Sequence, residues 1–210
     1  MRVLIVSFLI VLGDQVAKLI VKGVSVPSLG ISLRGIPYGS SRPLLGNFLR
    51  LTYIENPGMA FGIDIGGKLF FSLFSIVASV AIVAYLYHTR KESLGFRLSL
   101  AMILGGALGN LIDRVFYGVF YREAPLFYGR VVDFLDMDFF NVNLFGYQLT
   151  RFPVFNVADA AVTLGVILLV FFHRTTSSSR DALTHPPFAP QRAEDPPIQP
   201  PGAHPPEELN

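Results

Sequence analysis

The chain has 210 residues, of which 51% are hydrophobic and 15% charged, and its mean hydropathy is +0.50. This composition excludes an ordinary soluble domain and predicts a small polytopic membrane protein. The formal net charge of +2 gives no reason to expect a nucleic-acid partner. The chain contains no cysteine, which excludes disulfides, thiolate metal sites and a cysteine nucleophile.

Four segments are apolar over the length that a helix needs to cross a bilayer, which is roughly 20 residues. In chain order they cover about residues 3–21, 69–87, 96–116 and 155–172. We therefore predict a mainly α membrane protein, a four-transmembrane-helix bundle formed by residues 1–174. Two long polar connections, about 23–67 and 117–153, join the first pair and the last pair of spans, and a short basic loop joins the middle pair.

The first span contains two charged residues, Asp14 and Lys18, within its apolar run. They interrupt the run, which argues against a cleavable signal peptide. Their spacing of four places both side chains on one helical face, where they can form an ion pair. Two interpretations remain open: a neutralised pair that holds helices together, and a direct functional role.

The first long connection includes the stretch NFLRLTYIEN, residues 47–56, which is typical of a β-strand. Apolar residues fall on both faces of this predicted strand. That pattern suits a small sheet that lies on the membrane surface.

The third span ends in GGALGNLIDR, which combines small residues with Asn110, Asp113 and Arg114. Gly106 and its neighbouring glycines allow another helix to approach closely. The spacing places Asn110 on the same helical face as both Asp113 and Arg114. Arg114 could extend its side chain to the membrane interface, or it could keep nearby carboxylates ionised.

The fourth span begins with Asn156 as a predicted N-cap, followed three residues later by Asp159 in a capping-box position. Capping alone leaves a structural and a reactive role for Asp159 equally open. Asp133 lies between apolar neighbours before this span. Such surroundings raise the pKa of a carboxyl group, so Asp133 is a candidate acid or base.

Several chemistries find no support in the sequence. HExxH, G-x-S-x-G and P-loop motifs are absent, so we expect neither a metal nor a cofactor. The four histidines lie at the presumed cytoplasmic helix ends or in the tail, away from Asp133 and Asp159. Two adjacent carboxyl groups share one proton, because both cannot ionise cheaply, and such a pair can activate water against an amide.

Two other function classes remain open from the residues alone. Asp14, Asp113 and Asp159 could line a proton or cation path, although these acids lie at one end of the spans. Alternatively, the polar residues could join the helices of a non-catalytic scaffold.

Five motifs occur in an order that closely resembles lipoprotein signal peptidase, the signal peptidase II family: GDQVAK, ENPGMAFG, GGALGNLIDR, VVDF and FNVADAAVTLG. The resemblance covers about residues 1–174. It implies an intramembrane aspartic endopeptidase that removes signal peptides from prolipoproteins by cleaving before a diacylglyceryl-modified cysteine. It further implies that Asp133 and Asp159 form the catalytic pair. Supporting roles are implied for Asp14, Lys18, Asn56, Gly58, Gly106, Asn110, Arg114, Asn156 and Ala158.

The same resemblance implies a location in the bacterial inner membrane, with an active site facing the periplasm and both termini in the cytoplasm. Basic residues in the short loop favour this orientation, but arginines on the other side weaken the signal. Residues 23–67 would form a small extracytoplasmic β-cradle with a flap-like helix. We expect prolipoproteins, membrane lipid and globomycin-type inhibitors as partners of a monomeric enzyme.

Two features depart from the family pattern. The segment between Arg114 and Asp133 is longer than is usual in the family, and so is the segment that precedes the fourth span. Residues 175–210 are rich in Pro and Ser and poor in large apolar residues. We predict that they form a disordered cytoplasmic tail.

Overall fold

The computed structural model describes residues 2–60, 63–64, 67–138, 142–144, 147–149 and 151–184. Five α-helices occur in the described residues: α1 (Leu4–Lys22), α2 (Gly67–His88), α3 (Leu94–Ile112), α4 (Gly118–Phe120) and α5 (Val157–Thr184). A 3-10 turn, η1, covers Pro27–Leu29, and a π-helix, η2, covers Asp113–Tyr117 between α3 and α4.

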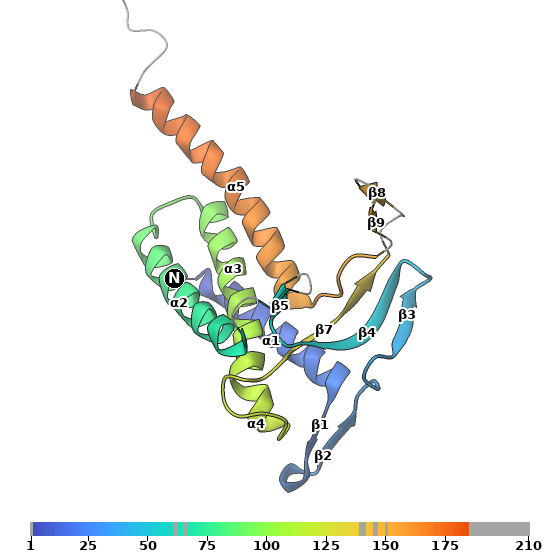
Figure 1. The fold of residues 1–210 in the computed structure, drawn as a ribbon. Helices are drawn as coiled ribbons and strands as arrows, with labels where there is room; N and C mark the ends of the chain where they lie inside the picture. The colour runs from blue at the N-terminus through green and yellow to red at the C-terminus, as the bar shows by residue number, and fades with distance from the viewer. Residues whose placement is uncertain are drawn as a thin grey trace, which may run out of the picture.

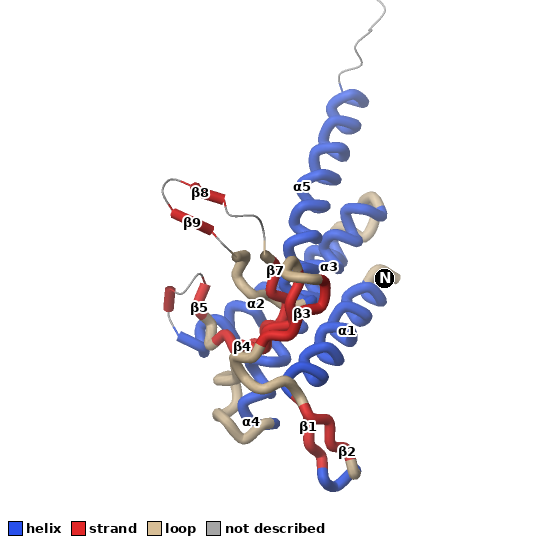
Figure 2. Tube along the Cα trace, turned by 90° about the vertical axis from the view of Figure 1, so that its right-hand side faces the viewer, coloured by secondary structure: helices blue, strands red, loops and turns tan. Residues whose placement is uncertain are grey.

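The strands form small antiparallel sheets beside one end of the helices (Figure 1), and Figure 2 shows them in red against the blue helices. The central sheet has the order β3-β4-β7, and three separate hairpins pair β1 with β2, β5 with β6 and β8 with β9. The strand bounds are β1 Gly23–Val26, β2 Ile31–Arg34, β3 Ser41–Leu45, β4 Leu49–Asn56, β5 Met59–Ala60, β6 Ile63–Asp64, β7 Val131–Met137, β8 Val142–Leu144 and β9 Tyr147–Leu149.

Three helices in the described part of the chain are long and apolar enough to cross a membrane: Leu4–Lys22, Leu69–His88 and Leu94–Phe120. The apolar part of α5, Val157–Phe172, is shorter than these. The first three predicted spans therefore correspond to helices of sufficient length. The fourth predicted span, about residues 155–172, corresponds to the first part of α5, which begins at Val157 directly after the cap residue Asn156.

Helix α3 lies at the centre of the bundle and contacts α1, α2 and α5. Small residues make these contacts close, as the glycines of the sequence indicate. A Cβ added at Gly106 would lie 2.2 Å from the carbonyl oxygen of Ala158, and one added at Gly105 would lie 3.0 Å from the backbone of Ser7. Helix α5 is thereby held directly against α3.

Replacing Gly106 by alanine is expected to lower the free energy of unfolding by roughly 1–3 kcal/mol, because backbone must move to admit the methyl group. Thermal unfolding in detergent measures this effect. Gly13→Ala is the matched control, since a Cβ at Gly13 has no atom within 4 Å. Equal unfolding temperatures for the two variants would contradict the packing argument.

The predicted strand within residues 47–56 is present as β4, which pairs with β7. In this ladder Ile54 lies opposite Asp133, and Asn56 lies opposite Val131. The free edge of β7 is covered by Phe155, whose carbonyl oxygen accepts hydrogen bonds from the backbone of Phe134 and Leu135. The ladder therefore brings Asp133 next to the start of α5.

Two expectations need correction. Helix α5 continues to Thr184, so the beginning of the predicted disordered tail is helical. The first proline after the apolar segment is Pro186, and no earlier residue forces the helix to end. Residues 185–210 lie outside the described residues. In the described part of the first connection, the only helical turn is η1, at the tip of the β1-β2 hairpin, in place of a flap-like helix.

Candidate active site

Asp133 and Asp159 come together at the N-terminus of α5, where β7 passes the start of the helix (Figure 1). Asn156 contacts both residues. Its side-chain amide donates a 2.7 Å hydrogen bond to Oδ1 of Asp133. The backbone N–H of Asp159 donates to Oδ1 of Asn156 over 2.9 Å, and that of Asn156 lies 3.3 Å from Oδ2 of Asp159. The predicted capping box is therefore present, and its cap residue also binds the second carboxylate.

Asn110 provides the second support for the pair. Its side-chain amide donates a 2.7 Å hydrogen bond to Oδ1 of Asp159. Its carbonyl oxygen accepts from the amide of Asn156 over 3.1 Å and from Nζ of Lys18 over 2.9 Å. The two asparagines thus fix the position of both carboxyl groups through a continuous set of hydrogen bonds from α3 to α5.

Lys18 lies at the centre of a fully buried ionic cluster. Its Nζ is 2.7 Å from Oδ2 of Asp14 and 2.8 Å from Oδ2 of Asp113. These carboxylates in turn accept backbone hydrogen bonds near the aspartate pair, from Ala158 to Asp14 (2.9 Å) and from Val132 to Asp113 (3.1 Å). The predicted Asp14–Lys18 pair is confirmed, and it anchors both β7 and α5.

Sequence reasoning missed two members of this cluster, Gln15 and Tyr117. The amide of Gln15 donates to Oδ1 of Asp113 (2.9 Å) and to the carbonyl oxygen of Gly109 (3.1 Å). The hydroxyl of Tyr117 donates to Oε1 of Gln15 over 3.0 Å. Gln15 lies inside the GDQVAK motif, and a polar side chain within an apolar span already indicated that it has a polar partner in the protein. Tyr117 carried no such signal, because aromatic residues are common at span ends.

Arg114 remains within the protein, although its position at the end of α3 allowed it to extend to the interface. One terminal nitrogen lies 3.4 Å from Oγ of Ser75, and its guanidinium lies 6.0 Å from the centre of the Phe71 ring, both on α2. Its Nε is buried without a hydrogen-bond partner. Arg114 interacts electrostatically with Asp133 and Asp159, so it supplies positive charge beside the pair.

Asn56 and Gly58 lie at the end of the β4-β7 ladder. The backbone N–H of Gly58 donates a 2.9 Å hydrogen bond to Oδ1 of Asn56. Gly58 has a φ of +104°, a region that side chains rarely adopt, and a Cβ there would lie 3.1 Å from the Phe71 ring. This turn therefore closes against the same α2 residue that Arg114 contacts.

Burial raises the pKa of the Asp133 carboxyl to about 7, and the negative charge of Asp159 adds to this shift. The hydrogen bond from Asn156 and the charge of Lys18 oppose it. Below this pH Asp133 holds a proton beside Asp159. The arrangement is the one that lets a carboxyl pair donate and accept protons near neutral pH.

We expect the turnover of such a pair to fall as pH rises through about 7, because Asp133 then loses the shared proton. The rate of precursor cleavage in detergent, measured between about pH 5 and pH 9, checks this expectation. Asn156→Ala removes a hydrogen bond that lowers the pKa of Asp133. The cleavage rate of this variant should therefore decline at a higher pH than that of the wild type. A rate that stays constant across this range would argue against protonated Asp133 as a participant.

Comparison with known proteins adds to this geometry. The family described as signal peptidase (SPase) II matches residues 6–174. The lipoprotein signal peptidase of Chlorobaculum parvum is 35% identical over 169 residues, which cover 80% of this chain and 92% of that protein. The chain belongs to the signal peptidase II family. A relative in Amoebophilus asiaticus is 40% identical over 152 residues, but the match covers 63% of this chain and 64% of that protein.

Solved structures agree with membership of the signal peptidase II family. A bacterial membrane enzyme solved at 2.3 Å has a TM-score of 0.60 and 31% identity, and the match covers 85% of this chain and 91% of that one. Signal peptidase II proteins are proteases, and the apolar helices described above make this member a multi-pass membrane protein. The resemblance carried by the five motifs is thereby confirmed.

Proposed function

We propose that the chain removes signal peptides from prolipoproteins as an aspartic endopeptidase, with Asp133 and Asp159 as the catalytic pair. The observation that carries this proposal is the double contact of Asn156, which binds Asp133 and caps the helix turn that bears Asp159. The pair would be supported, through the hydrogen bonds described above, by Asp14, Lys18, Asn110 and Ala158. Arg114, Asn56 and Gly58 would border the substrate, and Gly106 holds α5 in place.

In the proposed mechanism the two carboxyl groups begin with one proton between them. The ionised group removes a proton from water, and the resulting hydroxide attacks the carbonyl carbon of the scissile amide. The protonated group donates its proton to the carbonyl oxygen, which gives a tetrahedral diol. The diol then collapses: the carboxyl group that took its proton from water donates it to the amide nitrogen, and the other carboxylate takes a proton from a diol hydroxyl. The C–N bond breaks to yield a carboxylic acid and an amine, and the pair again holds one proton.

We further propose a four-span topology in which α5 is the fourth span, with both termini in the cytoplasm of an inner-membrane protein. The β-strands would then form an extracytoplasmic cradle beside an active site that faces the periplasm. This arrangement places the cleavage site at the ends of α1, α3 and α5, where an apolar lipid anchor can remain in the bilayer. Residues 1–174 would form the peptidase domain.

The proposed substrate is a prolipoprotein cleaved before its diacylglyceryl-modified cysteine, and globomycin-type peptides would compete for the same site. A proton or cation path through Asp14, Asp113 and Asp159 is less well supported, because Asp14 and Asp113 are both engaged by Lys18 inside the protein. The chain is proposed to act as a monomer.

The proposal is tested with the purified chain and two forms of one precursor, with and without the diacylglyceryl group. We expect cleavage of the lipidated form alone, and mass spectrometry should place the cut directly before the modified cysteine. A globomycin-type inhibitor should suppress it. Equal cleavage of both forms, or a cut elsewhere, would refute the substrate assignment, whereas no cleavage by the folded protein would refute the activity.

A further inference from the structure

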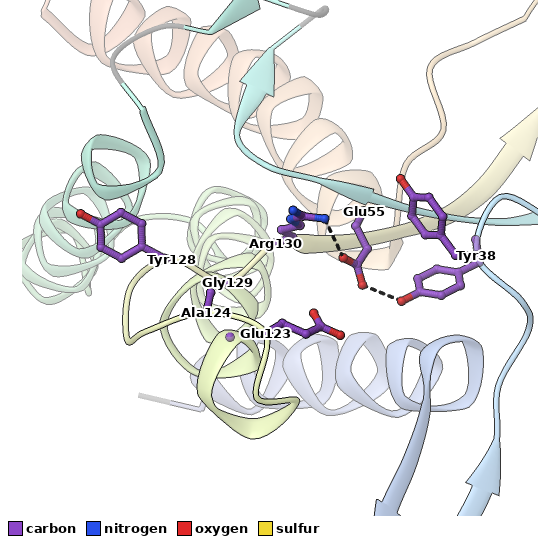
Figure 3. A pocket seen from close by; sticks show the side chains of 9 residues that line it. Tyr38, Glu55, Glu123, Ala124, Tyr128, Gly129 and Arg130 are labelled. Carbon is purple, nitrogen blue, oxygen red and sulfur yellow. Dashed lines mark hydrogen bonds and ion pairs between the residues drawn. The ribbon is translucent and has the colours of Figure 1, made fainter.

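A polar cavity lies on the opposite face of the β4-β7 ladder from Asp133. Glu55 pairs with Val132, whereas Ile54 pairs with Asp133, and adjacent residues of a strand point to opposite faces. The cavity has a volume of about 430 Å³ and includes Glu55 in its wall. The other side chains that matter here are Tyr38, Tyr53, Glu123, Tyr128 and Arg130 (Figure 3). It is therefore separate from the proposed catalytic site.

The carboxylate of Glu55 lies in the wall of this cavity and already has hydrogen-bond partners within the protein. Glu55 accepts hydrogen bonds from Nζ of Lys22 and, over 2.6 Å, from the hydroxyl of Tyr53. Burial alone would raise the pKa of Glu55, but the hydrogen bonds from Lys22 and Tyr53 lower it below its ordinary value. Glu55 is therefore ionised and engaged by groups of the protein itself.

Two charged side chains on the cavity wall remain accessible. The side chain of Arg130 is 52% exposed, and that of Glu123 is 49% exposed. The nearest approach of Arg130 to Glu55 is 3.7 Å, which is longer than a hydrogen bond, so its guanidinium retains donors for a ligand. Nζ of Lys22 donates to both carboxylate oxygens of Glu123, over 3.0 Å and 2.8 Å, and the half-exposed carboxylate still presents negative charge to solvent. The open cavity thus offers a cation and an anion on different walls, as Figure 3 shows.

The cavity lies at the level where two spans end. Lys22 is the last residue of α1, and Phe120 is the last residue of the apolar segment that includes α3. Two exposed apolar side chains follow wall residues closely in sequence: Phe120 (50%), two residues after Gly118, and Leu126 (44%), two residues after Ala124. Since apolar side chains at such a position face the lipid chains, the cavity opens near the headgroups.

We propose that this cavity binds the headgroup of a zwitterionic phospholipid from the membrane leaflet on the strand side. Arg130 would bind the phosphate, because a guanidinium provides paired donors for its oxygens. Glu123 would bind the ammonium group, and the acyl chains would run along Phe120 and Leu126. The cavity wall holds one cation, Arg130, and two anions, Glu55 and Glu123. This charge pattern favours a zwitterion over a purely anionic headgroup, which the two glutamates would repel.

The test uses the full chain, purified from a detergent mixture with equal amounts of phosphatidylethanolamine and phosphatidylglycerol, and native mass spectrometry of the lipids it retains. The wild type should retain phosphatidylethanolamine preferentially. Arg130→Gln should lower retention of both lipids by about tenfold, as expected for loss of one charge-assisted contact. Glu123→Gln should abolish the preference for phosphatidylethanolamine. Arg122→Gln, an exposed arginine of the same loop outside the cavity, should behave as wild type.

Three outcomes would overturn the lipid site. They are wild-type retention in Arg130→Gln, equal retention of the two lipids by the wild type, and displacement of the lipid by a soluble peptide that copies the mature part of a precursor. The last result would instead make the cavity a substrate subsite. Retention is measured without cleavage, so failure of this proposal leaves the proposed peptidase activity unaffected.

Discussion

Asp133→Asn is expected to lower kcat by roughly 10³-fold or more while the protein remains folded. An asparagine keeps the size of the side chain but can neither take a proton from water nor hold the shared proton. Asp159→Asn should have an effect of similar size, because neither carboxyl group can complete proton transfer alone. The double variant should be no slower than the slower single variant, since residues that act as a unit do not contribute additively.

Cleavage of a lipidated precursor under single-turnover conditions measures this loss, with thermal unfolding as a check on the fold. Asp138→Asn is a suitable control, because Asp138 follows β7 directly but its side chain is 40% exposed. It approaches Arg151 no closer than 4.0 Å, so it forms at most a weak ion pair. It should retain nearly full activity. If folded Asp133→Asn cleaves at a rate near that of the wild type, Asp133 is not a catalytic residue.

Lys18→Met should lower the free energy of unfolding by about 3–5 kcal/mol. The methionine side chain has similar length but leaves Asp14 and Asp113 as two buried carboxylates without their cation. The expected measurement is unfolding in mixed detergent micelles, followed by circular dichroism. Lys91→Met, at an exposed position in the short loop, is the matched control.

A second substitution distinguishes charge from packing at the same position. Adding Asp113→Asn to Lys18→Met removes one of the uncompensated charges, so part of the lost stability should return. Loss of the same size in the single and double variants would show that Lys18 acts through its shape and not through its charge.

Local patterns in the sequence were reliable guides to this molecule. The spacing of Asp14 and Lys18 predicted their ion pair, and the order of Asn156 and Asp159 predicted a capping box. Both are interactions within one or two helical turns, where backbone geometry alone decides which side chains meet. The stretch NFLRLTYIEN, residues 47–56, likewise predicted a strand, which the structure contains as β4.

Contacts between distant segments could not be derived in this way. The register that places Ile54 opposite Asp133 depends on a shift within the ladder, and no pattern in either strand specifies it. The hydrogen bond from Tyr117 to Gln15 joins residues that are 102 positions apart, and no local pattern in the sequence pairs them. The end of α5 was misplaced because polar composition, unlike proline, does not by itself end a helix.

The ion pair within α1 has a consequence for biosynthesis. The first span emerges from the ribosome long before the third, so Lys18 enters the membrane before Asp113 has been made. Asp14 lies four residues before Lys18 and can neutralise it at that stage, which reduces the cost of placing a lone cation in the bilayer. When the third span arrives, Lys18 can accept a second carboxylate without moving to another helix. The Asp14–Lys18 pair would therefore first keep α1 electrically neutral during insertion, and later hold the finished site in place.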